Sequence, residues 1–237
     1  MNTYVLVHGA WFGAWCWDKV VPLLRQAGHQ VITFDLPGHG QDKTVVSEVT
    51  LDLYARRTGE VLAAQMEPVI LVGHSMGGIV LSQTAERYPT KIQKLVYLTA
   101  FLLRDGEFLR QYAQSDTDAL ITPNAIPDET GTYLTLPTEK LKDIFYADCS
   151  DEDIARAKKL QVPQAIQPFG APVQVTPEHF GQIPRVYIEC LHDRAITLTC
   201  QRQMSTALPC QRVLTLDTSH APFLSAPEAL VNLLLSV

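Results

Sequence analysis

The chain has 237 residues, of which 46% are hydrophobic and 19% charged, and its formal net charge is −6. This length and composition predict one large globular domain, or one domain with a modest insertion. The acidic balance, without a run of lysines and arginines, argues against nucleic acid or a membrane surface as the partner. No window reaches the roughly 18 apolar residues that are typical of a membrane span.

The cysteines and the amino terminus bear on the compartment. Five cysteines, an odd number at irregular spacing, are typical of reduced thiols. The first residues lead directly into a predicted strand, with no basic segment ahead of a long apolar one, so we expect no secretion signal and a cytoplasmic protein. The chain has no C-x-x-C or H-E-x-x-H motif, and we expect neither a metal nor a cofactor.

Short apolar runs alternate with longer segments of helical period along the chain. The predicted strands are residues 3–9, 29–36, 69–73, 94–100, 185–191 and 212–217, and the predicted helices include residues 17–27, 51–65, 76–88 and 227–237. Several strands are apolar on consecutive residues, which is typical of strands covered on both faces. The pattern predicts an α/β fold with a mostly parallel, doubly wound sheet.

Residues 103–180 interrupt this alternation. They hold many of the prolines and acidic residues, include helical patches such as residues 151–160, and contain no convincing buried strand. We expect a mainly helical cap inserted into a core formed by residues 1–102 and 181–237. Such a cap would lie over the carboxyl edge of the sheet, where open α/β sheets bind their ligands.

The stretch VILVGHSMGG, residues 69–78, places a serine between two glycines where an apolar run ends. It contains the G-x-S-x-G motif with Ser75 at its centre, between a predicted strand and a predicted helix. A sharp strand-to-helix turn exposes the serine hydroxyl, so Ser75 is the predicted nucleophile. The alternative is a glycine-rich turn in which the serine caps a helix.

A serine nucleophile needs a base, and the base needs a carboxylate that orients it. His220 lies in a short polar loop after the last predicted strand, and we expect Pro222 to keep that loop from continuing as a helix. Asp193 directly follows another strand, which gives the order Ser75, Asp193, His220 expected with this type of turn. The alternatives are Asp217 as the carboxylate and a surface role for His220.

Negative charge that develops on a substrate carbonyl needs preorganised donors. The backbone N–H of Met76, directly after the nucleophile, is one predicted donor, and the N–H of Ala10 in the early HGAW stretch is the other. Gly9 lets the backbone approach closely there. The alternative is that His8 and Gly9 form an ordinary turn at a strand end.

The chain resembles an α/β-hydrolase in five stretches taken in order. These are LVHGAWFGAWCW, DLPGHG, LVGHSMGG, the loop of Asp193 and DTSHAPF. More narrowly, the chain resembles the group that contains the plant methyl esterases, the plant hydroxynitrile lyases and small bacterial esterases. The likeness extends over nearly the whole chain and is weakest in the insertion. It implies the α/β-hydrolase fold, and it leaves a homodimer open.

Two positions separate the branches of this group. By the resemblance, lyases carry a threonine where this chain has Gly9, and a lysine where it has Ala221. Esterases carry glycine and an apolar residue at these positions, as here. The resemblance therefore implies a serine carboxylic ester hydrolase that acts through an acyl-enzyme on small or aromatic esters. The alternatives are a hydroxynitrile lyase with the same triad, a non-catalytic small-molecule binding protein with a retained triad, and hydrolysis of thioesters, lactones or amides.

The resemblance also implies a substrate pocket between core and cap. Phe101, after the fourth core strand, is expected to face it, and Gly9 and Ala221 to border it. The cap residues expected to line it are Tyr133, Phe145, Tyr146 and Ile166. For these the alternative is ordinary packing of the cap on the core.

Overall fold

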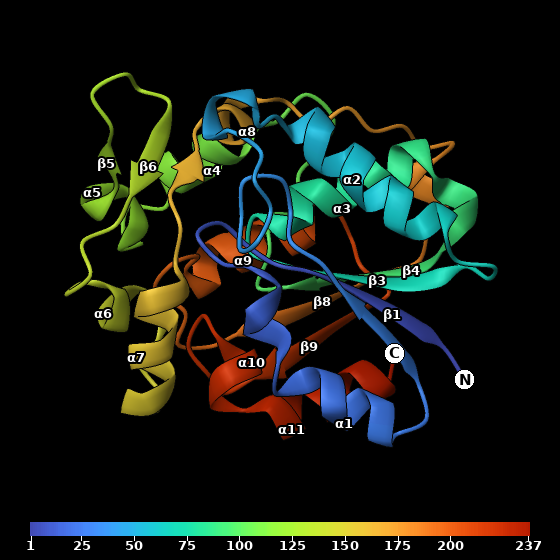
Figure 1. Cartoon of the computed structure of the whole chain (residues 1–237). Helices are drawn as coiled ribbons and strands as arrows, with labels where there is room; N and C mark the ends of the chain where they lie inside the picture. The colour runs from blue at the N-terminus through green and yellow to red at the C-terminus, as the bar shows by residue number, and fades with distance from the viewer.

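The computed structural model describes all residues, 1–237. Six parallel strands form the central sheet in the order β2–β1–β3–β4–β8–β9 (Figure 1). The strands are β1 (Thr3–Val7), β2 (Gln30–Thr33), β3 (Val69–His74), β4 (Ile92–Leu98), β8 (Arg185–Cys190) and β9 (Arg212–Leu216). The prediction of a parallel α/β sheet is confirmed.

Helices cover both faces of this sheet. α1 (Val20–Gln26) packs with α11 (Pro227–Leu235) on one face, and α2 (Leu51–Ala63) packs with α3 (Gly77–Arg87) on the other (Figure 1). α9 (Leu198–Ala207) connects β8 to β9. All six residues of β3 are buried, which explains why its sequence is apolar without alternation.

The first predicted helix begins later than expected. A 3-10 turn at Ala14–Trp17 comes first, and α1 starts only at Val20. The side chain of Trp17 is fully buried and packs on the ring of Phe223 at 5.2 Å. The predicted helix of residues 17–27 therefore begins as the end of a 3-10 turn and continues as a shorter helix.

The cap lies between β4 and β8. Its helices are α4 (Leu109–Ser115), α5 (Ile121–Asn124), α6 (Leu141–Phe145), α7 (Asp151–Leu160) and α8 (Gln167–Gly170). It also contains a small antiparallel sheet of β5 (Ile126–Pro127), β6 (Tyr133–Thr135) and β7 (Gln164–Ala165). The sequence did not predict this sheet, because strands of two or three residues are too short to show a period.

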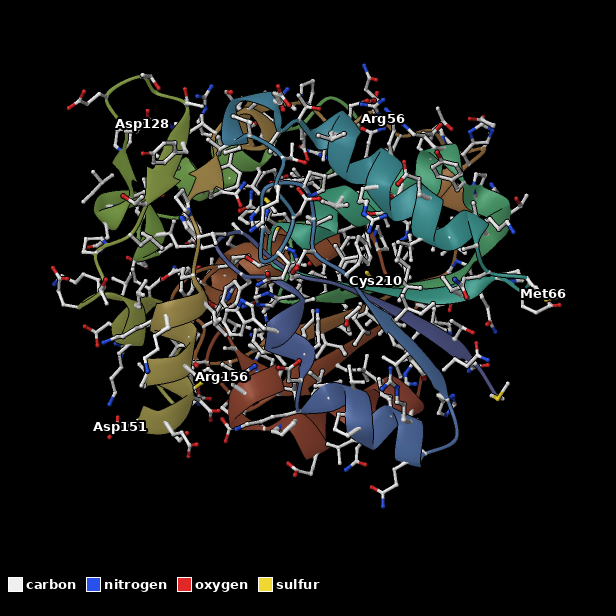
Figure 2. All side chains as sticks on the ribbon, viewed as in Figure 1. Arg56, Met66, Asp128, Asp151, Arg156 and Cys210 are labelled. Atoms are coloured by element: carbon white, nitrogen blue, oxygen red, sulfur yellow. The ribbon has the colours of Figure 1, made fainter.

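Helix α7 has the bounds that its sequence predicts. The Ser150 hydroxyl accepts a hydrogen bond from the Asp153 N–H at 3.2 Å and so caps the amino end. Acidic residues fill the first turn, and lysines the last, which complements the helix dipole. Figure 2 shows Asp151 of this helix, and Asp128 of the β5–β6 loop, on the outer side of the cap, whereas Arg156 of the helix pairs with Asp18 of the core.

The strand order fixes where a ligand site can form. β1 has β2 on one side and β3 on the other, so the chain turns in opposite directions from its carboxyl end. A crevice forms at such a switch point in open α/β sheets. None of the helices combines the length and the apolar character that a membrane crossing requires.

Candidate active site

Ser75 lies in the turn between β3 and α3. Its φ is +55°, a left-handed value that residues other than glycine rarely adopt. Its N–H donates to the Leu98 carbonyl at 3.3 Å, and its carbonyl accepts from the Phe101 N–H at 3.1 Å. A β-carbon on Gly73 would lie 2.5 Å from Leu81 Cδ1, so the turn closes against its own helix only because position 73 is glycine. The core therefore holds Ser75 in a strained turn at the strand end.

Asp193 follows β8 and its carboxylate is fully buried. Oδ1 accepts hydrogen bonds from the Ala195 N–H at 2.7 Å and the Ile196 N–H at 3.0 Å. Oδ2 accepts from the Thr99 hydroxyl at 2.5 Å and lies 2.6 Å from His220 Nδ1. A carboxylate only accepts hydrogen bonds, so the proton of the imidazole ring is on Nδ1.

His220 follows β9 and has no exposed surface. With the proton on Nδ1, the other nitrogen, Nε2, is the acceptor of the neutral ring, and it has no hydrogen-bond partner. The His74 ring donates from Nε2 to the His220 backbone carbonyl at 2.9 Å, and the Phe145 ring stacks on the imidazole at 5.3 Å. A buried, oriented acceptor without a partner is what a general base requires.

No hydrogen bond joins the Ser75 hydroxyl to His220 Nε2 in this structure. His74, directly before Ser75 in the chain, has its ring 4.5 Å from the His220 ring. Hydrogen bonds between catalytic groups are often long without substrate and shorten in the complex. The structure thus joins Asp193 to His220, and the residue before Ser75 packs on His220.

The loop of His220 runs directly into α10 (Pro222–Ser225). The expectation that Pro222 would keep this segment from becoming helical was wrong. Proline fits the first position of a helix, because its missing N–H has no carbonyl partner there and its φ is already helical.

The Ala10 and Met76 N–H groups both belong to residues that line the cavity above Ser75. Neither donates to another group of the protein, although buried N–H groups are nearly always paired. His8 fixes the orientation of the Ala10 N–H. Its Nε2 accepts from the Leu36 N–H at 3.0 Å, so its proton is on Nδ1, which donates to the Gly9 carbonyl at 2.8 Å. That carbonyl and the Ala10 N–H share one rigid peptide plane.

Burial keeps the groups around the triad uncharged. It lowers the pKa of His8 and His74 well below the usual value. Nearby His39 lowers the pKa of His8 further, and nearby His220 lowers that of His74. Burial also raises the pKa of the Cys16 thiol well above its usual value. No group of three or more histidine, cysteine, aspartate and glutamate side chains is arranged to hold a metal ion.

A cavity of about 240 Å³ lies above Ser75, and 12 of its 16 lining residues are hydrophobic. Core residues Ala10 and Met76 line it beside the nucleophile, and the cap contributes residues from α4, α5, β6 and α8. Cavities of about 150 Å³ hold benzene. The cavity therefore has room for an aromatic ring with a few further atoms.

Two of the predicted lining residues, Phe101 and Ile166, line the cavity, and Tyr133 does not. Tyr133 lies on β6, where its neighbour Leu134 faces the cavity instead. Successive side chains of a strand point to opposite faces, so a prediction one residue off selects the wrong side chain.

The other predicted border residues lie behind the cavity wall. Phe145 and Tyr146 are almost fully buried and pack on Phe12, with ring centroids 5.4 Å and 6.0 Å apart. Gly9 backs directly on the nucleophile, since a β-carbon there would lie 2.8 Å from Ser75 Cβ. Ala221 has no exposed surface.

Several site residues were not singled out from the sequence. Thr99, which donates to Asp193, follows β4 and has a φ of +37°; its place at a strand end was the available signal. Trp11 follows Ala10 and lines the cavity. Its indole N–H donates to the Leu134 carbonyl at 3.1 Å, and its own carbonyl accepts from the Val162 N–H at 3.3 Å. Trp11 thus ties the loop of Ala10 to the cap.

Comparison with known proteins adds to this geometry. The Alpha/beta hydrolase family matches residues 4–233 of the chain. "Putative methylesterase 11, chloroplastic" of Arabidopsis thaliana is 34% identical over 100% of this chain, which spans 64% of that relative's length. "Pyrethroid hydrolase" of Sphingobium wenxiniae is 35% identical over 96% of this chain and 84% of its own length. The crystal structure of polyneuridine aldehyde esterase superposes with a TM-score of 0.89 at 28% identity, over 100% of this chain and 98% of that one.

Proposed function

The chain belongs to the alpha/beta hydrolase family, and from that premise we propose that it is a serine carboxylic ester hydrolase acting through an acyl-enzyme on small or aromatic esters. Its relatives include Methylesterase 9 of Arabidopsis thaliana and a pyrethroid hydrolase, so it is an enzyme of the carboxylesterase type (EC 3.1.1 class). The observation that carries the mechanism is the 2.6 Å contact of His220 Nδ1 with Asp193 Oδ2, with Nε2 unpartnered.

In the proposed acylation step, Ser75 Oγ attacks the ester carbonyl and its proton moves to His220 Nε2. Asp193 stabilises the imidazolium that forms and holds the ring in place. The carbonyl oxygen becomes an oxyanion, which accepts hydrogen bonds from the Ala10 and Met76 N–H groups. His220 then returns the proton to the departing alkoxide, so an alcohol leaves and the acyl group stays on Ser75.

In the proposed deacylation step, His220 takes a proton from a water molecule, and the resulting hydroxide attacks the acyl carbonyl. The same two N–H groups hold the second oxyanion. When the intermediate collapses, Ser75 Oγ leaves with the proton from His220, and a carboxylic acid is released. The cavity of about 240 Å³ supports a small or aromatic acyl or alcohol group.

Two positions support hydrolysis over cyanohydrin cleavage. Position 9 has no room for a side chain, because a β-carbon there would lie 2.8 Å from Ser75 Cβ and 2.9 Å from His74 Nδ1. Position 221 is a fully buried alanine, which supplies no charge. A departing cyanide would therefore meet neither a hydroxyl nor an ammonium group at these two places.

The test compares wild type and Ser75→Ala on p-nitrophenyl and methyl esters of graded acyl size, with mandelonitrile alongside. We expect ester turnover in the wild type and a loss of about 10³-fold or more in the variant, with an unchanged Tm. An organophosphate should label the wild type once per chain and the variant not at all. Faster cleavage of mandelonitrile than of every ester would establish the lyase instead, and absence of labelling would leave a binding protein.

The cytoplasmic location and the homodimer stand with this proposal as predictions. All five cysteines are free, and four of them are buried, which supports a reducing compartment. Fractionation of the host cell tests the location, and light scattering of the purified protein tests the dimer.

A further inference from the structure

We propose that Arg110 and Gln114 form a carboxylate subsite at the mouth of the cavity, so that the preferred substrates are half-esters of dicarboxylic acids. In such a substrate one acyl end is the ester that meets Ser75, and the other is a free carboxylate. This inference rests on the proposed ester hydrolysis and assigns it a substrate class.

The charge of the cavity wall is the first observation. Arg110 is the only charged residue among those that line the cavity, and no carboxylate lines it. It lies in the first turn of α4 in the cap and is exposed to solvent, which places it where the cavity opens. A cation in the first turn of a helix is unfavourable for the helix dipole, so helix stability does not explain its position.

Arg110 also has no partner within the protein. All other arginines except Arg194 donate to a carboxylate or to a backbone carbonyl. Glu107, three residues before Arg110, is the nearest acidic residue in sequence, but it accepts from Arg104 at 2.8 Å and from the Tyr112 hydroxyl at 2.9 Å. The Arg110 guanidinium therefore keeps its donors free.

Gln114 lies one helical turn beyond Arg110, on the same face of α4, and also lines the cavity. Its amide makes no hydrogen bond within the protein. The remaining polar wall residue from the cap, Thr122, uses its hydroxyl proton to donate to the Ala113 carbonyl at 2.8 Å. Asp116, just beyond Gln114, accepts from the Thr197 N–H and hydroxyl. The free donors of the cap wall are thus gathered on Arg110 and Gln114.

The chemistry of these donors selects the ligand. A guanidinium presents paired N–H groups that match the two oxygens of a carboxylate, and an amide N–H can add a further donor. Between them and Ser75 the wall is apolar, which suits a methylene chain or an aromatic ring. A half-ester provides all three parts: an ester, an apolar spacer and an anion.

The test measures kcat/KM for the monomethyl esters of dicarboxylic acids from succinic to suberic acid. Each is paired with the methyl ester of the same length that ends in a carboxamide. We expect the wild type to prefer the best acid over its amide by about tenfold at low ionic strength, because a charge-assisted hydrogen bond at a solvent-exposed mouth is partly screened. The preference should appear in KM, since this contact is equal in the ground and transition states.

Two variants and salt locate the origin of the preference. Arg110→Gln should reduce the acid-to-amide ratio of kcat/KM to about one, and Arg110→Lys should retain part of the preference for the acid. In the wild type, 0.5 M NaCl should weaken the preference, because the screening length is then about 4 Å. Arg194→Gln removes the other unpaired arginine, which does not line the cavity, and should leave the ratio unchanged.

The outcomes separate this inference from the function on which it rests. Hydrolysis of the amide-ended esters without any preference for the acids would overturn the subsite and leave the esterase intact. A preference that survives Arg110→Gln, or that disappears equally in Arg194→Gln, would also overturn it. Hydrolysis of neither series, nor of p-nitrophenyl esters, would overturn the proposed function itself.

Discussion

Replacing Asp193 with asparagine keeps the shape of the side chain but is expected to move a proton on His220. The native Oδ1 atom accepts from two backbone N–H groups, those of Ala195 and Ile196, at 2.7 Å and 3.0 Å. These donors cannot rotate away, so the amide oxygen of the variant must take this place. Its NH₂ group then faces His220 Nδ1 and the Thr99 hydroxyl.

The size of the effect follows from that orientation. An NH₂ group donates to His220 Nδ1, so the ring proton moves to Nε2, where the ring can no longer accept the proton of Ser75. A wrong tautomer of this kind lowers kcat on the order of 10⁴-fold, or about 5.5 kcal/mol of transition-state stabilisation. The Thr99 hydroxyl can turn and accept from the new NH₂ group, so we expect a Tm close to that of the wild type.

The assay is the steady-state turnover of p-nitrophenyl butyrate, with the Tm of each variant measured alongside. Asp217→Asn is the matched control, because Asp217 is the other carboxylate near His220 in sequence, yet it is exposed and pairs with His192 at 2.7 Å. We expect the control to change kcat less than about twofold, as for most exposed substitutions. An Asp193→Asn enzyme that retains a tenth of wild-type turnover would refute the assigned role, as would a larger loss in the control.

Two further predictions concern the same region. Gly9→Ala places a β-carbon 2.8 Å from Ser75 Cβ and 2.9 Å from His74 Nδ1, so the nucleophile must shift. We therefore expect kcat to fall by about 10²-fold. An unchanged kcat on p-nitrophenyl butyrate would contradict this. Burial lowers the pKa of His8 and His74, so below about pH 6.5 the unfolded chain binds protons that the folded chain does not. The free energy of unfolding should therefore be steady above that pH and fall below it, by up to about 3 kcal/mol per pH unit for the pair. Urea unfolding at pH 7.5 and pH 5.5 measures this, and equal stabilities would argue against neutral buried histidines.

The sheet was predictable because its strands carry their signal in consecutive residues. Runs such as VILVG are apolar without alternation. Parallel strands place their carboxyl ends at one edge, and for this reason the sequence predicts one site for Ser75, Asp193 and His220, each of which follows a strand. The distances between them depend on turn geometry, which strand patterns do not specify.

The cap was less predictable for physical reasons. Its strands have two or three residues, too few for their sequence to show which side chain faces inward. For this reason Tyr133 was predicted to line the cavity, whereas Leu134 lines it. Phe145 was expected in the wall and instead stacks on His220, because the direction of a five-residue helix is set by packing and not by its own period. Arg110 carries no sequence signal, since its significance comes from the partners it lacks.

The two hydrogen bonds of Trp11 to the cap limit how this enzyme can be altered. Trp11 directly follows Ala10, a proposed oxyanion donor. Its indole N–H bonds to the Leu134 carbonyl, and its carbonyl accepts from the Val162 N–H. A lid exchanged to admit bulkier esters would replace both anchor points and release the segment that carries Ala10. Breadth of substrate range and speed of turnover are therefore expected to change together in any chimera made at this boundary.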